Sequence, residues 1–195
     1  MKIELTEEEI AARLREAQFT TSADGYAQNN TSTHKYAAVL VPLLRQDDEW
    51  HLLYTRRTEH VESHKGQVSF PGGAWDEGET TPEQTALRET HEEIGVPPGE
   101  IRLLGRLNPM PTITSFIVTP VVGVIPWPTV FRPEQAEVAR IFTMPLKWLA
   151  ERSNRWEFNM LGRDYSVIVY HPFDGEVLWG ATARMTVDFL QVIQT

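Results

Sequence analysis

The segment from Gly73 to Gly95 constrains this chain more than any other part of its sequence. It holds seven acidic residues against one basic residue, and so carries six of the nine net negative charges of the 195-residue chain. Its second half has the signals of a capped helix, with Thr81 at the N-cap, Pro82 at the first helical position and Gln84 completing a capping box. Gly95 suits the C-terminal end of that helix. These signals predict a helix over residues 81–93 that follows a glycine-rich turn.

Three carboxylates gather on one face of this predicted helix. At about 100° per residue, Glu89, Glu92 and Glu93 fall within roughly 100° of one another. Leu87 and Thr90 fall on an arc that turns toward a core. Like charges at this spacing destabilise an isolated helix by about 0.2–0.5 kcal/mol per pair. Two interpretations stay open from the residues alone. The face is either a solvated acidic surface or a site for a hard cation such as Mg²⁺, Mn²⁺ or Ca²⁺, which prefers oxygen ligands.

The residues around the helix favour the cation site. Phe70 ends a strand-like run, and the glycines at 72 and 73 allow the backbone to turn sharply or to approach a ligand closely. A backbone carbonyl at this turn, which we assign to Gly73, could join the carboxylates as a ligand. Arg88 lies next to the carboxylates in the sequence, where its guanidinium could brace one of them or meet a phosphate.

The rest of the chain mixes strand-like and helical patterns without a regular βαβ repeat. A capping box at Thr6 and Glu9 predicts an N-terminal helix, and a polar turn at residues 46–49 predicts a hairpin between the first two strands. Further helices are predicted over residues 145–151 and from about residue 179. Strands are predicted over residues 36–44, 50–57, 101–107, 113–125, 156–161 and 165–170. This mixture predicts an α+β fold, arranged as an α/β/α sandwich around a mixed sheet.

Composition excludes several classes of function. The chain has no cysteine, which excludes a disulfide scaffold, cysteine-ligated zinc, an iron–sulfur cluster and a thiol nucleophile. Its acidic charge and lack of a basic stripe argue against nucleic acid and anionic membranes as partners. No stretch approaches the roughly 18 apolar residues of a membrane span, and the first ten residues lack the pattern of a secretory signal. We therefore expect a cytoplasmic protein that binds neither nucleic acid nor membrane.

A segment of opposite character precedes the acidic helix. Between His51 and Lys65 the chain carries Arg56, Arg57 and Lys65 together with three of its six histidines. Arg57 and Lys65 are candidate phosphate contacts, because a guanidinium can bind a phosphate bidentately and an ammonium can bind it as a point charge. A basic edge strand followed by a solvated loop explains the same residues without a ligand. The histidines lack the spacing of zinc ligands.

The acidic segment also matches a known pattern. Gly73 and Glu79 lie six positions apart, and a run follows that reads Arg88-Glu89-Thr90-His91-Glu92-Glu93-Ile94-Gly95-Val96. This arrangement resembles the Nudix box. It departs from the box at two points, because eight residues instead of seven separate Glu79 from Arg88, and Thr90 replaces an apolar residue. The resemblance implies a Nudix-like fold with a mixed sheet between helices, and an enzyme that hydrolyses a diphosphate joining a nucleoside to another group.

The segment upstream of the box resembles one branch of the Nudix hydrolases. Residues 53–58 and 64–73 are similar to the signature of the coenzyme A pyrophosphohydrolases, as is the run over residues 179–183. The resemblance implies coenzyme A or an acyl-coenzyme A as the substrate, and coenzyme A would yield 4′-phosphopantetheine and adenosine 3′,5′-bisphosphate. Glu62 stands where that signature usually has a basic residue, which keeps ADP-ribose, a dinucleotide or a nucleotide sugar open as substrates. A non-catalytic Nudix-like binding module is a further alternative, against which the three retained carboxylates argue.

The resemblance implies roles for individual residues as well. A divalent cation, Mg²⁺ or Mn²⁺, would be held by Glu89, Glu92, Glu93 and Gly73. The implied catalytic residues are Glu89, Glu93 and Arg88. The implied substrate-binding residues are Arg57, Lys65 and Gln67. One carboxylate would act as the base toward the attacking water, with Glu89 as the first choice and Glu134 or Glu137 as the alternative.

The resemblance covers roughly residues 36–192, so it divides the chain in two. Residues 1–34 are expected to form an N-terminal helix and a flexible linker, and residues 35–195 the Nudix hydrolase domain. The N-terminal residues fit either a helix that packs on this domain or a contact in a homodimer.

Overall fold

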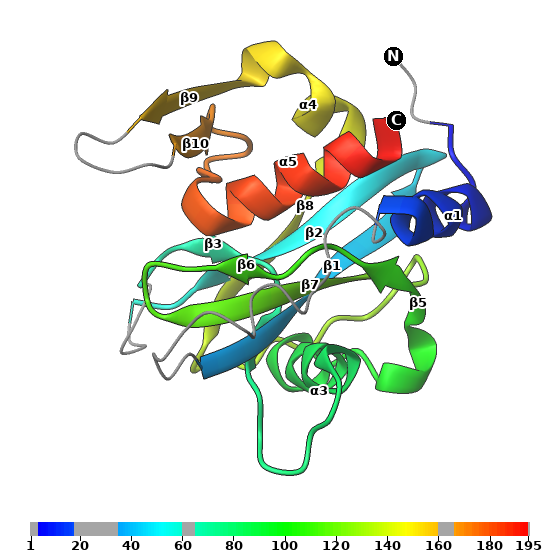
Figure 1. The fold of residues 1–195 in the computed structure, drawn as a ribbon, viewed down its shortest axis with the longest axis vertical. Helices are drawn as coiled ribbons and strands as arrows, with labels where there is room; N and C mark the ends of the chain where they lie inside the picture. The colour runs from blue at the N-terminus through cyan, green and yellow to red at the C-terminus, as the bar shows by residue number, and fades with distance from the viewer. Residues whose placement is uncertain (1–3, 18–34, 60–64, 160–165, 195) are drawn as a thin grey trace.

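The computed structural model describes residues 4–17, 35–59, 65–159 and 166–194 (Figure 1). Its helices are α1 (Glu7–Ala17), α3 (Pro82–Ile94), α4 (Leu146–Ala150) and α5 (Gly180–Gln194), with 3-10 turns η2 (Pro98–Glu100) and η3 (Arg152–Asn154). Its strands are β1 (Lys35–Gln46), β2 (Glu49–Arg57), β3 (Val68–Ser69), β4 (Gly72–Ala74), β5 (Arg102–Arg106), β6 (Met110–Pro111), β7 (Phe116–Val124), β8 (Val138–Pro145), β9 (Arg155–Asn159) and β10 (Ser166–Tyr170). In the described part of the chain, no helix is long and apolar enough to cross a bilayer.

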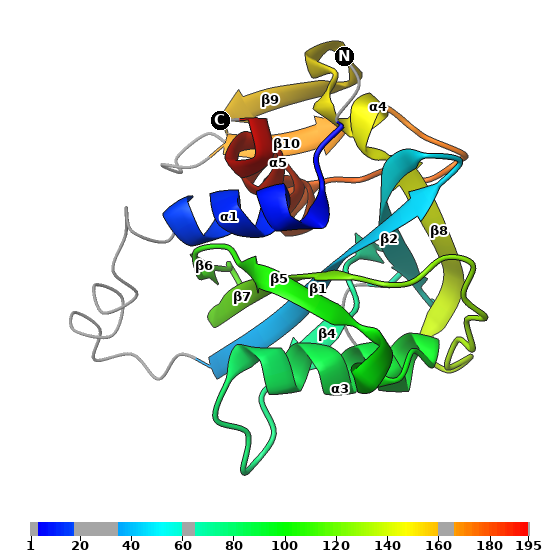
Figure 2. The same ribbon diagram turned by 90° about the vertical axis from the view of Figure 1, so that its right-hand side faces the viewer.

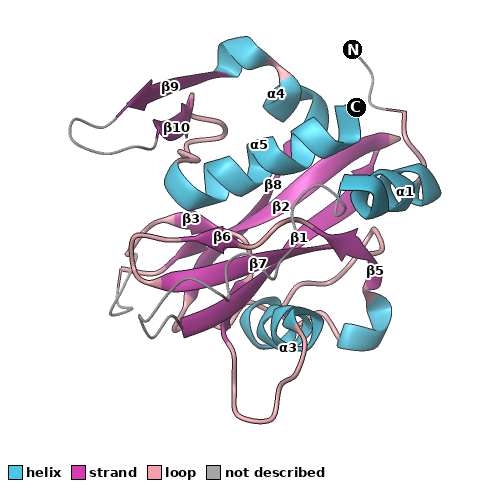
Figure 3. Cartoon of the chain, viewed as in Figure 1, coloured by secondary structure: helices cyan, strands magenta, loops and turns pink. Residues whose placement is uncertain are grey.

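A mixed sheet forms the middle layer of the molecule. Its strand order is β3-β2-β1-β7-β5, with β8 on β2, β4 on β1 and β6 on β7. Helix α3 covers one face of this sheet, and α1 and α5 cover the other (Figures 2 and 3). A separate two-stranded sheet of β9 and β10 lies beside α5. The predicted α+β fold, an α/β/α sandwich around a mixed sheet, is therefore confirmed.

The predicted hairpin is formed by β1 and β2, which pair antiparallel with Leu43 opposite Leu52. The two turn residues, Asp47 and Asp48, have positive φ angles of 46° and 62°. Aspartate tolerates this left-handed region, which two-residue hairpin turns require. On its other side β1 pairs in parallel with β7, so β1 lies at the centre of the sheet.

The N-terminal helix packs onto the domain of its own chain. The predicted capping box is present, because Glu9 accepts from the N–H of Thr6 at 2.8 Å and donates its own N–H to the Thr6 hydroxyl. Ile10 and Leu14 are fully buried in the hydrophobic cluster that also holds α5. Of the two interpretations of the N-terminal segment, a helix packed on its own domain or a contact in a homodimer, the structure supports the first. The predicted linker falls in residues 18–34, which lie outside the described residues, so the division at residue 34 stays a prediction.

Strand β8 was not predicted, and its sequence gives the reason. Val138, Phe142 and Met144 are buried at alternate positions, as in a half-buried strand, but Arg140 interrupts this alternation. Arg140 is accommodated there by Glu176, which lies 36 residues away in sequence and accepts from its guanidinium at 3.0 Å. Because a partner so distant in sequence compensates the charge, the sequence pattern alone does not indicate a strand.

Candidate functional site

Helix α3 begins and ends as the sequence predicts, and this fixes the face that each of its side chains occupies. The Thr81 hydroxyl accepts from the N–H of Gln84, and the Gln84 side chain accepts from the N–H of Thr81. Gly95 ends the helix with a φ of 75°, and its N–H donates to the carbonyl of His91 at 2.9 Å. Glycine adopts this left-handed conformation without strain.

The three carboxylates of α3 share one face but differ in burial. Glu93 is 3% exposed and lies against the sheet. The side chain of Glu89 is 18% exposed and that of Glu92 is 58% exposed. The predicted cluster is therefore graded, from a buried carboxylate at Glu93 to a solvent-facing one at Glu92.

The turn before α3 brings backbone against the two inner carboxylates. A Cβ atom on Gly73 would lie 2.3 Å from Oε1 of Glu89, which is closer than real Cβ contacts come. The backbone of Gly72 lies near the carboxylate of Glu93, where it acts to lower the pKa of that carboxylate. The glycine pair thus brings the backbone close to the glutamates of α3, whereas a close approach to a ligand stays a prediction. Gly72 was not predicted as a site residue, although it belongs to the same glycine pair as Gly73.

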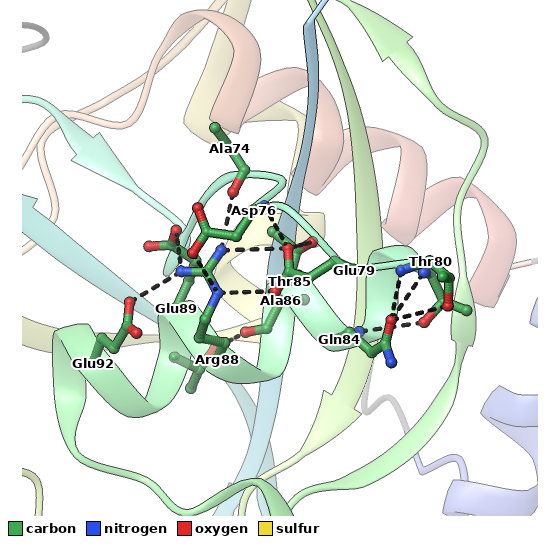
Figure 4. Close-up of polar contacts among 12 residues, drawn as sticks. Ala74, Asp76, Glu79, Thr80, Gln84, Thr85, Ala86, Arg88, Glu89 and Glu92 are labelled. Carbon is green, nitrogen blue, oxygen red and sulfur yellow. Dashed lines mark hydrogen bonds and ion pairs between the residues drawn. The ribbon is translucent and has the colours of Figure 1, made fainter.

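Arg88 is surrounded by acceptors of its own chain (Figure 4). Its Nε donates to Glu79 at 2.8 Å, and its Nη1 donates to Glu89 at 2.8 Å and to Glu92 at 3.0 Å. Its Nη2 donates to the carbonyl of Ala74 at 3.0 Å. Of the two roles considered for Arg88, these contacts favour bracing the carboxylates over meeting a phosphate. The same contacts tie α3 to the turn that precedes it.

The ion pair of Arg88 and Glu79 is expected to stabilise the fold at neutral pH and to lose this effect in acid. The Arg88 guanidinium, helped by the Thr85 hydroxyl, lowers the pKa of Glu79 from 4.5 to about 2. The folded pKa lies below the unfolded one, so ionised Glu79 stabilises the fold above about pH 4.5, and this contribution is lost as the pH falls toward 2. We expect Glu79→Gln to lower Tm at pH 7, and the difference from wild type to shrink as the pH falls from 5 to 2. Thermal denaturation followed by circular dichroism measures this, and a pH-independent difference would contradict it.

Arg57 contacts a different set of carboxylates from Arg88. Its Nη1 is 3.4 Å from Oε1 of Glu93, and its Nη2 is 3.5 Å from Oε2 of Glu137. The structure thus brings Arg57, predicted as a substrate contact, to Glu93 and Glu137. Glu134, the other alternative base, accepts from the N–H of Ala136 at 3.2 Å within its own turn. Of these two side chains, that of Glu137 contacts Arg57 of the site, whereas that of Glu134 bonds within its own turn.

The other two predicted substrate contacts, Lys65 and Gln67, lie in the segment before β3. Lys65 is exposed and Gln67 is half-buried. The backbone carbonyl of Gln67 accepts from the N–H of Arg57 at 3.0 Å, which attaches this segment to the end of β2. Glu62, the position that departs from the coenzyme A signature, lies in residues 60–64, outside the described residues.

Burial changes the acidity of the two inner carboxylates. Burial raises the pKa of Glu93 to about 8, an effect that Arg57 opposes and that Glu89 and Glu137 reinforce. Burial also raises the pKa of Glu89, although Arg88 opposes it. Both carboxylates therefore lack the positive charge that would compensate them fully. A cation placed between them would supply it.

The donors of this site fit a hard divalent cation. Oε2 of Glu93 is buried and has no hydrogen-bond partner among the described residues. Carboxylate and carbonyl oxygens are the ligands that Mg²⁺ and Mn²⁺ prefer. Within the described ranges, no three acidic or histidine side chains are already close enough together to hold a metal ion. In this structure the three glutamates are held by arginines, Glu93 by Arg57 and both Glu89 and Glu92 by Arg88.

Both the sequence and the fold of this chain are similar to those of known proteins. A family model described as NUDIX domain matches residues 34–163. A protein named uncharacterized Nudix hydrolase NudL, from Escherichia coli O6:H1 (strain CFT073), is 38% identical over 149 residues, which cover 76% of this chain and 72% of the relative. A protein of the same name from Enterobacter sp. (strain 638) is 40% identical over 152 residues, which cover 76% of this chain and 78% of the relative.

Two solved structures share the fold at low sequence identity. A MutT/nudix family protein from Enterococcus faecalis aligns with a TM-score of 0.56 at 16% identity, over 98% of this chain and 75% of that chain. The Nudix hydrolase RenU from M. smegmatis aligns with a TM-score of 0.51 at 24% identity, over 60% of this chain and 74% of that chain. At these identities the likeness concerns the fold alone.

Proposed function

Because this chain belongs to the Nudix hydrolase family, we propose that it hydrolyses the diphosphate of coenzyme A or of an acyl-coenzyme A. With coenzyme A the products would be 4′-phosphopantetheine and adenosine 3′,5′-bisphosphate. Nudix hydrolases act on phosphorus anhydride bonds and generally need divalent metal ions. What we propose beyond this family assignment is the substrate, the identity of the ion and the roles of individual residues.

One observation carries the coenzyme A proposal. Residues 53–58 and 64–73, which resemble the coenzyme A signature, include residues that contact the carboxylate site. They supply Arg57 and Gly72 to Glu93, and they supply the close approach of Gly73 to Glu89. A signature that builds the site itself supports a link between that signature and the substrate that the site takes.

The proposed metal ligands are Glu89, Glu92, Glu93 and the carbonyl of Gly73, with Mg²⁺ or Mn²⁺ as the ion. When bound, such an ion neutralises charge on the diphosphate and lowers the pKa of a coordinated water. Glu93 would contribute the unpartnered Oε2, which is already buried beside the sheet. Arg88 would act as a positioning residue, because its contacts hold Glu89 and Glu92 in place. Lys65 and Gln67 are proposed to contact the substrate at the approach to the site.

Glu89 is our first choice for the base that accepts a proton from the attacking water. Its carboxylate is close to the backbone of Gly73, and burial raises its pKa, which makes the ionised carboxylate a stronger base. Glu137 is the alternative, because its side chain is 49% exposed and can meet water directly. The pH dependence of kcat in Glu89→Gln and Glu137→Gln separates the two.

A substrate panel tests the proposed function. We expect coenzyme A and acetyl-coenzyme A to be cleaved in the presence of Mg²⁺ or Mn²⁺, with the two products identified by mass spectrometry. ADP-ribose, a dinucleotide and a nucleotide sugar serve as competing substrates, and Glu93→Gln serves as the control for a contaminating hydrolase. Intact coenzyme A alongside cleaved ADP-ribose would contradict the coenzyme A proposal while leaving the Nudix hydrolase class in place.

Two further predictions from the sequence stay predictions. A cytoplasmic location rests on the sequence alone. A homodimer would be tested by size-exclusion chromatography with light scattering, since α1, the segment considered as a dimer contact, buries Ile10 and Leu14 in its own chain.

A further inference from the structure

We propose that Arg57 is a positioning residue, which holds Glu93 of α3 and Glu137 of the loop before β8 at fixed places on two sides of the candidate metal site. This differs from the phosphate contact that its charge suggested in the sequence. The inference rests on the proposed function, because the position of Glu137 matters to turnover only if the carboxylate site is where hydrolysis takes place.

The backbone aims Arg57 at this site. β2 pairs with β8 up to Arg56 opposite Arg140, and the register then shifts so that Arg57 lies opposite Val138. Irregularities of this kind re-aim side chains at strand ends. Arg56 turns to Glu176, with 3.6 Å between their charged atoms, whereas Arg57 turns to the α3 side of the sheet. Neighbouring arginines of one strand thus have separate partners.

The guanidinium of Arg57 spans two elements. Its two Nη atoms are directed to different carboxylates, 3.4 Å from Glu93 and 3.5 Å from Glu137, and its side chain is only 23% exposed. A planar fork can reach two acceptors at once, whereas the ammonium of a lysine acts as a single point charge. In the metal-free protein, a phosphate that drew Arg57 away would leave the nearly buried carboxylate of Glu93 without its cation, which is costly.

The loop that carries Glu137 is otherwise attached by its backbone. Arg132 and Glu134 donate their N–H groups to the carbonyls of Ile94 and Glu93, both at 2.9 Å. At the far end of the loop, Thr58 donates its N–H to the carbonyl of Glu137 at 2.8 Å. These bonds place the main chain but leave the half-exposed Glu137 side chain to be oriented by its contact with Arg57. Arg57 therefore sets the distance between the Glu137 carboxylate and α3.

The substitution Arg57→Lys distinguishes positioning from phosphate binding. We expect kcat to fall by at least about tenfold, as for residues that orient metal ligands, while KM changes by less than about threefold. A phosphate contact would behave in the opposite way, because lysine also binds phosphate as a point charge and the loss would fall on KM. The matched control is Arg56→Lys, on the other face of the same strand, for which we expect both constants within about twofold of wild type.

A double-mutant cycle with Glu137→Gln tests whether Arg57 acts through Glu137. We expect Arg57→Lys to lower kcat by a smaller factor when Glu137 is already replaced than in the wild-type background, because residues in contact are not additive and only the contact with Glu93 is then left to lose. In metal-free protein the combined loss of Tm should fall short of the sum of the two single losses by about 2 °C. A raised KM with unchanged kcat, or additive losses in both measurements, would overturn the inference. If the wild type cleaves no substrate of the panel, the proposed function fails, and the Tm cycle still decides whether Arg57 and Glu137 are coupled.

Discussion

The variant Glu93→Gln is expected to lower kcat by at least about 10²-fold with Mg²⁺ or Mn²⁺, because residues that merely orient metal ligands already cost 10–100-fold. Glu93 is 3% exposed, and its Oε2 has no partner among the described residues. A carboxylate oxygen buried in this state is the donor most suited to a cation. Glutamine keeps the shape of the side chain but removes the charge, so the fold should persist while turnover is lost.

The same variant should have the opposite effect on the stability of the metal-free protein. Burial raises the pKa of Glu93 from 4.5 to about 8, so the folded protein retains a proton that the unfolded chain releases. Stability is therefore lost as the pH rises from 4.5 toward 8, because the folded state then binds more protons than the unfolded state. We expect the Tm of Glu93→Gln relative to wild type to rise over this range when both are measured in EDTA.

Glu92→Gln is the matched control on the same helix face. Its side chain is 58% exposed and contacts Arg88, so we expect a smaller loss of kcat than for Glu93 and no gain of Tm at high pH. Steady-state kinetics and circular dichroism of the two variants provide the comparison. If Glu93→Gln turned over substrate like the wild type, Glu93 would not be a ligand of the proposed metal site.

Gly73→Ala is expected to lower kcat by about 10²-fold while costing little stability, since a displacement of about 1 Å in a catalytic group has that effect. The added Cβ would lie 2.3 Å from Oε1 and 2.5 Å from Cδ of Glu89. These atoms form the far end of a flexible side chain, which can move aside. The carboxylate that is our first choice for the base would thus be displaced while the backbone stays in place.

The neighbouring glycine provides a contrast. A Cβ on Gly72 would lie 2.4 Å from the carbonyl oxygen of Ala38 and 2.5 Å from Cα of Val39, which are backbone atoms of the central strand. We expect Gly72→Ala to lower the free energy of unfolding by about 1–3 kcal/mol, as overpacking does. Gly99→Ala, with no atom within 4 Å of the added Cβ, is the neutral control. Equal losses of Tm in the variants at 72 and 73 would contradict this division between a structural and a functional glycine.

The sequence predicts those parts of the fold that local interactions specify. Thr81, Gln84 and Gly95 define α3 because capping involves groups only a few residues apart, and Asp47 and Asp48 define the hairpin for the same reason. The periodicity of α3 also brings its three glutamates to one face, a consequence of helix geometry alone. Local order of this kind needs no knowledge of what packs against the element.

Burial within the site could not be predicted in the same way. Helix periodicity treats Glu92 and Glu93 alike, yet one is 58% exposed along its side chain and the other is 3% exposed as a residue. The difference arises because the sheet and the glycine turn cover one edge of the helix face and leave the other open. Strand β8 could not be predicted from the sequence for a related reason. The charge of Arg140 within it is compensated by Glu176, which lies 36 residues away in the sequence.

The sequence by itself therefore determined helix α3, the glycine turn before it and the carboxylate chemistry that both imply. Tertiary structure alone decided which carboxylate lies deepest and which residues Arg57 holds. Arg88 meets Glu79 only nine residues away, and its bracing role was already one of the two considered from the sequence. Arg57 meets Glu137 across 80 residues of chain, so its partner depends on how two strands and a loop converge. Charge and spacing along a chain encode local partners, whereas contacts between distant segments depend on the packing of the whole sheet.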